Sequence, residues 1–190
     1  IAEYGGDPDF IAITGGSAGG HLAALVGLTA GDPEYQPGFE SADTSVAGCI
    51  GLYGVYDFLD REGHHPHGGL RRVLSHYVMK SSPSEAIEDW ERASPLYRVH
   101  AGAPPFLLLH GTHDPLVPVE TARRFAEALR EAEVSPTVLL EFPGGQHAFE
   151  VFPSLRAAIG VEAIDRFASW LYSTAPRARS ADPPPRVANG

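Results

Sequence analysis

The chain has 190 residues, 43% of them hydrophobic and 20% charged, a balance typical of a single globular domain with a real core. Its 14 basic and 24 acidic residues give a formal charge of −10, which argues against nucleic acid as a partner and against binding to anionic membranes. The acidic residues are scattered along the chain, as on a solvated surface.

The start of the chain is unusual. It opens at Ile1 without a methionine, in a pattern typical of the last turn of a helix that stops at Gly5. No signal-peptide pattern follows, and no apolar run approaches the roughly 20 residues of a membrane span. The sequence leaves the compartment unknown. The cytoplasm is the default expectation, and any targeting segment would lie upstream of Ile1.

Four apolar runs of strand length predict a parallel sheet. The runs are near-continuous rather than alternating, as in strands that are buried on both faces. Helical patterns lie between them, so strands and helices alternate, which indicates an α/β fold with right-handed crossovers. In chain order the runs are Phe10–Thr14, Val46–Tyr53, Phe106–His110 and Thr137–Phe142.

Three helices accompany these strands. The segment between Ser17 and Leu28 is almost entirely small and apolar, so we expect it to be buried against the sheet. Val119–Glu133 has charges on one face and a single apolar stripe on the other, made by Ala122, Phe125, Ala126 and Leu129. The last helix is predicted over about 154–172. Its inward residues are expected to be Leu155, Ala158, Ile159, Ala163, Phe167 and Leu171.

Residues 58–98 do not follow the alternation. They contain a histidine-rich loop, a helical pattern over Leu70–Met79 and another piece over Pro83–Arg92. We interpret 58–98 as a cap-like insertion that covers a pocket, within one catalytic domain of residues 1–172. The proline-rich tail, residues 173–190, cannot pack a core and is expected to be disordered.

The run Gly15-Gly16-Ser17-Ala18-Gly19 matches Gly-x-Ser-x-Gly and lies directly between a strand and a helix. A serine in such a turn has a strained backbone, and the helix N-terminus favours developing negative charge. The pattern indicates Ser17 as a nucleophile and the backbone N–H of Ala18 as an oxyanion donor. A P-loop would need a lysine, and a dinucleotide-binding fingerprint would need glycine in place of Ser17. A plain glycine-rich turn is the remaining alternative.

A serine hydroxyl needs a base, and the base needs an acid that orients it. In parallel α/β folds with such a serine turn, the nucleophile, the acid and the base follow one another along the chain as Ser, Asp and His. The acid and the base lie at the carboxyl ends of later strands. Asp114 follows the third strand and His147 follows the fourth. Asp57, after the second strand, is the alternative acid, and His113 is the alternative base.

Other chemistry-bearing residues are assigned to packing or surface. His64, His65 and His67 have no cysteine or carboxylate at ligand spacing, so we expect a solvated loop and no metal or cofactor. Cys49, the single cysteine, lies in an apolar run and is expected to be a small core residue. Packing or surface roles are also expected for His21, His76, His100 and His110.

The segment from Tyr4 to Ala23, which contains the serine motif, resembles the carboxylesterases related to hormone-sensitive lipase. Ala93–Leu96, Pro104–Phe106, His110–Pro118 and Gly145–Phe149 extend the resemblance through about residue 172. The resemblance implies an α/β-hydrolase fold and an acyl-enzyme mechanism on small-molecule carboxylic esters. It puts Ser17, Asp114 and His147 in the triad positions. A prolyl-oligopeptidase-like serine peptidase, which shares their order, is the alternative.

The sequence departs from the family pattern in two places. Gly16 stands where many relatives have aspartate before the nucleophile. Only 16 residues precede Ser17, and none of them forms a His-Gly-Gly-Gly-type oxyanion loop. By resemblance, the earlier strands and the main oxyanion donors would lie in a missing N-terminal half. The Phe10–Thr14 strand would then keep an open edge, free to pair with that half or with another chain. A non-catalytic half-domain that acts by such pairing is a further alternative.

Overall fold

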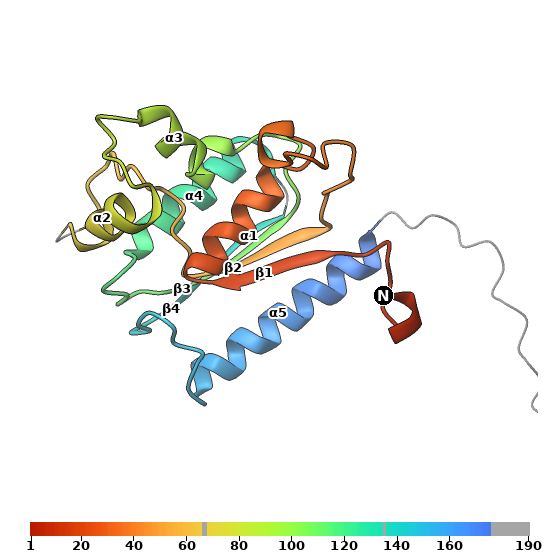
Figure 1. The fold of residues 1–190 in the computed structure, drawn as a ribbon. Coiled ribbons are helices and arrows are strands. Elements are labelled where there is room, and N and C mark those ends of the chain that lie inside the picture. Colours follow the sequence, from red (N-terminus) through yellow and green to blue (C-terminus); the bar gives the residue numbers. More distant parts are fainter. Residues whose placement is uncertain (66–67, 135, 176–190) are drawn as a thin grey trace, which may run out of the picture.

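The computed structural model describes residues 1–65, 68–134 and 136–175. Within them, parallel strands form one sheet in chain order, β1-β2-β3-β4, and helices connect the strands, so the predicted α/β class is confirmed (Figure 1). The strands are β1 (Ala12–Gly16), β2 (Gly48–Leu52), β3 (Phe106–Gly111) and β4 (Thr137–Phe142).

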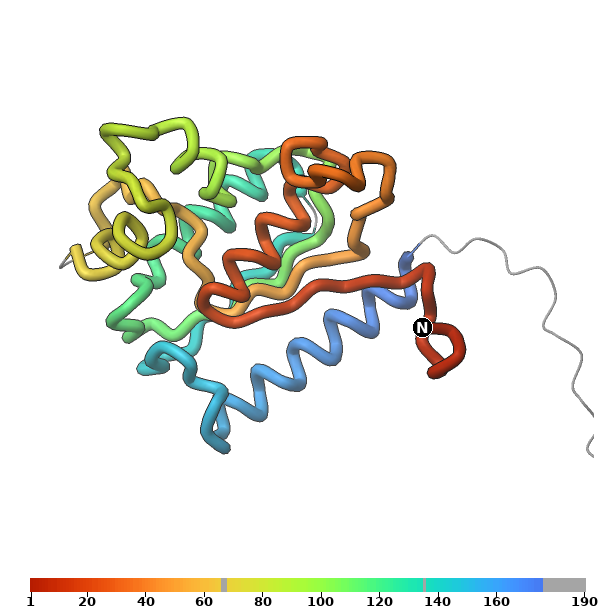
Figure 2. Tube along the Cα trace, viewed as in Figure 1, coloured from red at the N-terminus to blue at the C-terminus, as the bar shows by residue number. Residues whose placement is uncertain are grey.

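The helices cover both faces of the sheet. α1 (Ala18–Leu28) and α4 (Val119–Glu131) pack on one face, and α5 (Leu155–Thr174) lies on the other (Figure 1). The N-terminal segment passes the C-terminal end of α5 (Figure 2), where the rings of Phe10 and Tyr172 meet edge to face at 5.0 Å. None of the described helices is both long and apolar enough to cross a membrane.

The short elements lie in the connections. Ala2–Tyr4 is one turn of 3-10 helix that ends at Gly5 with φ 80°, as the glycine stop predicted. The others are the 3-10 turns η2 (Pro33–Tyr35) and η4 (Pro95–Arg98), the helices α2 (Gly69–Val73) and α3 (Ile87–Arg92), and the π-helical turn η3 (Leu74–Val78).

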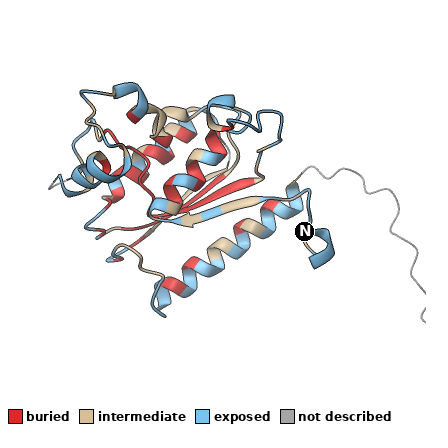
Figure 3. Cartoon of the chain, viewed as in Figure 1, coloured by how far each residue is buried: buried red, intermediate tan, exposed pale blue. Residues whose placement is uncertain are grey.

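The strand positions were predicted better than their burial. β1 begins at Ala12 rather than Phe10 and continues to Gly16, so the chain is extended up to the residue before Ser17. β2 and β3 are buried along their whole length, whereas β1 and β4 are half-exposed (Figure 3). The expectation of burial on both faces was therefore wrong for β1 and β4. They are the edge strands, and an apolar run alone does not distinguish an edge strand from a central one.

In two helices, the face that packs on the sheet differs from the one predicted from the sequence. In α1, the small residues Ala23 and Ala24 face the sheet, while Leu22 and Val26 are 57% and 40% exposed, so the helix is not buried all round. In α5, the buried residues Ala157, Gly160, Phe167 and Leu171 form the contact stripe. Phe167 and Leu171 were predicted correctly, but Leu155, Ala158 and Ile159, also expected inward, lie outside this stripe and are exposed. Small residues permit the close approach of helix and sheet, so the larger side chains next to them point away.

The core has a cluster on each face of the sheet and a third above its carboxyl end. The predicted stripe of α4 is confirmed, because Ala122, Phe125, Ala126 and Leu129 are fully buried against β3 and β4. Within residues 58–98, Phe58, Leu59, Leu74 and Trp90 form the third cluster with Val55 and Val117.

The ends of the predicted segments differ in detail. The helical pattern predicted over Leu70–Met79 forms α2 followed by the π-helical turn, and only the end of Pro83–Arg92 is helical, as α3. α5 continues to Thr174, two residues beyond the predicted end of the domain. Residues 176–190, where a disordered tail was expected, lie outside the described residues.

Candidate active site

Ser17 lies in the tight turn between β1 and α1. Its backbone has φ 55° and ψ −118°, the strained conformation expected of such a turn, and its N–H donates to the carbonyl of Leu52 at 2.9 Å. A Cβ atom on Gly15 would lie 2.4 Å from the backbone carbonyl of Gly19, so no side chain fits there. Ala18 is the first residue of α1, and its N–H is therefore among those without an acceptor inside the helix.

His147 lies between Ser17 and Asp114. Its Nε2 is 2.8 Å from Ser17 Oγ, and its Nδ1 is 2.7 Å from Asp114 Oδ2. Because an ionised carboxylate only accepts hydrogen bonds, the proton of the neutral imidazole is on Nδ1. Nε2 is then free to accept the proton of the Ser17 hydroxyl. The structure thus joins in one hydrogen-bonded chain three residues that the sequence placed after three different strands.

The carboxyl group of Asp114 is fully buried and heavily hydrogen-bonded. Oδ1 accepts from the backbone N–H groups of Leu116 and Val117, each at 2.9 Å, and the imidazoles of His147 and His110 approach Oδ2. Burial by itself raises the pKa of this carboxyl. The hydrogen bonds from His110, His147 and the two N–H groups outweigh burial and hold the Asp114 pKa below its ordinary value. The side chain is therefore an anion at neutral pH.

The loops that carry Asp114 and His147 are tied to each other. The N–H of Thr112 donates to the carbonyl of Phe142 at 3.1 Å, and the N–H of His113 donates to that of Gly145 at 2.9 Å. The His113 ring is exposed and lies against Thr112, so the structure does not bring this alternative base to Ser17.

The alternative acid also lies elsewhere. Asp57 Oδ1 accepts the N–H of Leu59 at 2.9 Å, in the turn that follows β2. Among the described residues, the carboxylate bonded to His147 is that of Asp114.

Tyr53 is a site residue that the sequence did not reveal. Its ring packs edge-on against the His147 ring, with centroids 4.7 Å apart, and its hydroxyl donates to Glu150. Burial, followed by the bond to Glu150 and its charge, raises the pKa of Tyr53, so the phenol stays protonated and can donate. Tyr53 therefore links the end of β2 to the loop that carries His147.

Gly16 makes room for this tyrosine. A Cβ atom at position 16 would lie 2.7 Å from the Tyr53 hydroxyl oxygen, closer than such atoms approach. The sequence showed that Gly16 departs from the family pattern, but it gave no indication that the Tyr53 ring occupies the space beside this glycine.

A cavity of about 300 Å³ adjoins Ser17 and His147. Its walls are mostly apolar and come from Val55 at the end of β2, from Leu116 in the loop after β3 and from Leu70 in α2. His65 is a polar residue in the wall. The segment interpreted as a cap thus contributes part of the cavity.

The other histidines and the cysteine have contacts of their own. His21 is buried, stacks on Phe58 and bonds through Nε2 to the carbonyl of Ala93 at 2.7 Å. Burial lowers the pKa of His21 and raises the pKa of Cys49 to about 12, so the buried cysteine is a poor nucleophile. Within the described ranges, no three histidine, cysteine or acidic side chains cluster in a way that would hold a metal ion. His67, one of the three histidines considered for a metal, lies outside those ranges.

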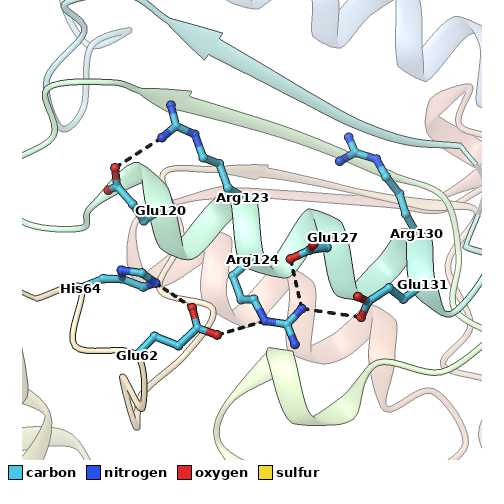
Figure 4. A pocket seen from close by; sticks show the side chains of 8 residues that line it. All are labelled: Glu62, His64, Glu120, Arg123, Arg124, Glu127, Arg130 and Glu131. Carbon is cyan, nitrogen blue, oxygen red and sulfur yellow. Dashed lines mark hydrogen bonds and ion pairs between the residues drawn. The ribbon is translucent and has the colours of Figure 1, made fainter.

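A second hollow, on the outer face of α4, is lined by charges most of which pair with one another (Figure 4), while Arg130 donates to the carbonyl of Thr137. Arg124 contacts Glu62, Glu127 and Glu131 at 3.3–3.6 Å. Arg123 pairs with Glu120 in the same way. Exposed pairs of this kind contribute little to stability, and their charges are mutually satisfied, so this hollow does not compete with the cavity beside Ser17.

Comparison with known proteins gives consistent matches. The BD-FAE family model matches residues 1–129. The chain is 46% identical over 189 residues to the probable carboxylic ester hydrolase LipM of Mycobacterium tuberculosis, covering 99% of this chain and 43% of that protein. Esterase LipQ of the same organism is 46% identical over 172 residues, covering 90% and 40%. Propionate-bound esterase 2 of Thermogutta terrifontis superposes with a TM-score of 0.69 at 31% identity, covering 93% and 61%. The chain thus spans about two fifths of the length of these curated relatives.

Proposed function

The chain belongs to the BD-FAE family and has the α/β-hydrolase fold, and on that premise we propose that it hydrolyses carboxylic esters through a covalent acyl-enzyme. The hydrogen-bonded chain from Ser17 through His147 to Asp114 carries the proposal. The names of the mycobacterial relatives, a carboxylic ester hydrolase and an esterase, support the same reaction class.

In the proposed mechanism, Ser17 Oγ attacks the ester carbonyl while Nε2 of His147 takes its proton. The N–H of Ala18 donates to the oxyanion that forms, and Asp114 stabilises the imidazolium. The tetrahedral intermediate collapses as His147 returns the proton to the leaving alcohol, which leaves an acyl ester on Ser17. Water, deprotonated by the same imidazole, then releases the carboxylic acid and restores the serine.

The surroundings of Ser17 fit a small apolar substituent. The cavity next to the serine is lined by Val55, Leu70 and Leu116, which suits an acyl or alcohol chain. We assign the hydrolase domain to residues 1–174, two residues beyond the predicted end because α5 continues to Thr174, with 58–98 as a cap-like insertion that forms one wall of this cavity.

A comparison of ester and amide turnover tests the reaction class. We expect 4-nitrophenyl butyrate to be cleaved much faster than an aminoacyl nitroanilide of similar size, and a fluorophosphonate probe to label the chain. Ser17→Ala should abolish both, while Ser84→Ala, which changes an exposed serine, should leave both intact. Faster amide cleavage would favour the peptidase. A folded protein that the probe does not label would favour the non-catalytic half-domain.

We also propose that the open edge of β1 pairs with another segment, from the rest of a longer protein or from a second chain. Among the described residues, β1 is hydrogen-bonded on one side only, to β2; Ile11, just before it, and Leu22 in α1 are 58% and 57% exposed. Apolar side chains at an unpaired strand edge favour association. Such a partner segment could add oxyanion donors to that of Ala18. Loss of one such donor typically costs about 10²–10³ in turnover.

A further inference from the structure

A buried aspartate–histidine pair lies in the loop between β2 and α2, apart from the three residues at Ser17. Asp60 accepts the backbone N–H groups of His64 at 2.7 Å and His65 at 3.0 Å, and its Oδ2 is 3.1 Å from Nδ1 of the His65 ring. The side chains of Asp60 and His65 are only 8% and 5% exposed. Asp60 also has φ 47°, a conformation that side-chain-bearing residues seldom adopt. The loop thus uses a buried carboxylate and an uncommon backbone to hold one imidazole.

This contact favours one tautomer of the neutral His65 ring. The carboxylate of Asp60 is 3.1 Å from Nδ1 and can only accept, so a proton on Nδ1 is favoured, which leaves Nε2 as a bare acceptor. Burial lowers the pKa of His65, although the charges of Asp60 and Asp57 oppose it, and this favours the neutral ring. Within the part of the chain that the structure describes, Nε2 of His65 is buried and has no hydrogen-bond partner. A buried acceptor without a partner is unfavourable, so a ligand that supplies a donor would be bound more tightly.

His65 lines the same cavity as Ser17 and His147, where the other walls are largely apolar. Nε2 itself is covered in this structure, so a ligand must displace the side chains over it to reach the nitrogen. We propose that Nε2 of His65 then accepts a hydrogen bond from a hydroxyl group of the ester in this cavity, and that esters bearing such a hydroxyl are the preferred substrates. This inference rests on the proposed ester hydrolysis. A carboxylate in the same place is disfavoured, because the bare Nε2 cannot donate to it and Asp60 lies behind the ring.

Matched ester pairs test the preference. One pair differs in the acyl chain, 4-nitrophenyl 3-hydroxybutanoate against 4-nitrophenyl butanoate. The other differs in the alcohol, 2,3-dihydroxypropyl butanoate against propyl butanoate. We expect kcat/KM to favour the hydroxyl-bearing member by about tenfold in at least one pair, the effect of one well-placed neutral hydrogen bond.

Substitutions assign that preference to His65. His65→Phe should lower kcat/KM for the hydroxyl-bearing ester more than for its partner, so that the ratio of the two falls to about one. His65→Gln keeps an acceptor and should retain part of the ratio. His64→Phe, which changes the neighbouring histidine paired with Glu62, should keep the whole ratio. A ratio near one in the native protein for both pairs, or a ratio that His65→Phe leaves intact, would overturn the proposal.

A binding measurement separates this inference from the proposed reaction. In the Ser17→Ala variant, which should bind but not cleave, the ¹⁵N resonance of His65 Nε2 should shift on addition of ethyl 3-hydroxybutanoate and not on addition of ethyl butanoate. If no ester is cleaved by the native protein but this shift occurs, the hydrolase proposal fails and the hydroxyl site stands. If esters are cleaved and neither compound moves the resonance, the hydroxyl site fails alone.

Discussion

At the scale of single residues, Asp114 can be tested against its rival Asp57. In the proposed mechanism, Asp114→Asn leaves His147 with an amide neighbour and the wrong tautomer, so kcat for 4-nitrophenyl butyrate should fall by about 10⁴. Asp57→Asn changes a carboxylate that serves the turn at Leu59 and should alter kcat only a few-fold. Steady-state kinetics of the two variants measure this. The opposite ranking would show that Asp57 is the acid.

The same carboxylate should make folding stability depend on pH. The pKa of Asp114 is held below its ordinary value in the folded state, so its charged form favours folding. This contribution is complete at pH values above the ordinary aspartate pKa of about 3.9 and is lost as the pH falls toward the lower folded pKa. We expect the stability gap between the native protein and Asp114→Asn to shrink from pH 6 to pH 2 in urea unfolding. A gap that stays constant would contradict the assigned shift.

Tyr53 is expected to position His147 rather than to react. Tyr53→Phe removes the bond to Glu150 but keeps the ring contact with His147, so kcat should fall by about tenfold with little change in KM. Tyr77→Phe, at a 78% exposed tyrosine, is the matched control and should leave kcat unchanged. Gly16→Ala should also lower kcat, because its Cβ would displace the Tyr53 hydroxyl. Unchanged kinetics in both Tyr53→Phe and Gly16→Ala would remove Tyr53 from the site.

At the scale of an element, the packing of α1 on the sheet depends on its small residues. A Cβ atom on Gly27 would lie 2.2 Å from Cys49 Sγ in β2, so Gly27→Ala should lower the free energy of unfolding by about 1–3 kcal/mol. Gly19, in the same helix, has open space around the corresponding position. Gly19→Ala should therefore be stabilising by about 0.4–1 kcal/mol. Urea unfolding of the two variants tests this contrast, and effects of the same sign would contradict the packing described for α1.

The sequence predicted where the helices and strands lie more reliably than which of their faces are buried. Apolar runs located the described strands because burial of β2 and β3 demands such runs. The resemblance, not the runs, led us to expect an open edge at β1, and nothing in the sequence revealed that β4 is the other edge. The amphipathic stripe of α4 was evident because charges mark its other face. α5 has apolar residues on several faces, so the prediction was right for Phe167 and Leu171 and wrong for the residues of its first turns.

Sequence patterns likewise located only part of the candidate site. Ser17, Asp114 and His147 follow from a local motif, a strand context and a chain order, all of which are properties of sequence. Tyr53 was not found in this way, and the expectation that His65 lies in a solvated loop was wrong, because its side chain is only 5% exposed. Their roles depend on tertiary contacts, with the His147 ring in one case and with the cavity wall in the other.

At the scale of the whole molecule, the charge and the exposed apolar surface oppose each other. A formal charge of −10 keeps copies of the chain apart, whereas the open edge of β1 and the exposed side chains of α1 favour association. Added salt screens the repulsion over a distance of about 10 Å at 0.1 M and leaves the apolar attraction in place. Association of the isolated chain should therefore increase with salt, which sedimentation velocity can measure across a concentration series.

Charges placed at this surface should prevent that association without unfolding the protein. Ile11→Lys and Leu22→Lys change residues that are 58% and 57% exposed, so the thermal midpoint should hardly move while the associated fraction falls. Val161→Lys changes a 64% exposed residue of α5, on the sheet face opposite α1, and is the matched control that should leave association unchanged. If Ile11→Lys and Leu22→Lys associate as the native chain does, the surface around β1 is not the one that pairs. The proposed docking of a further segment there would then be contradicted.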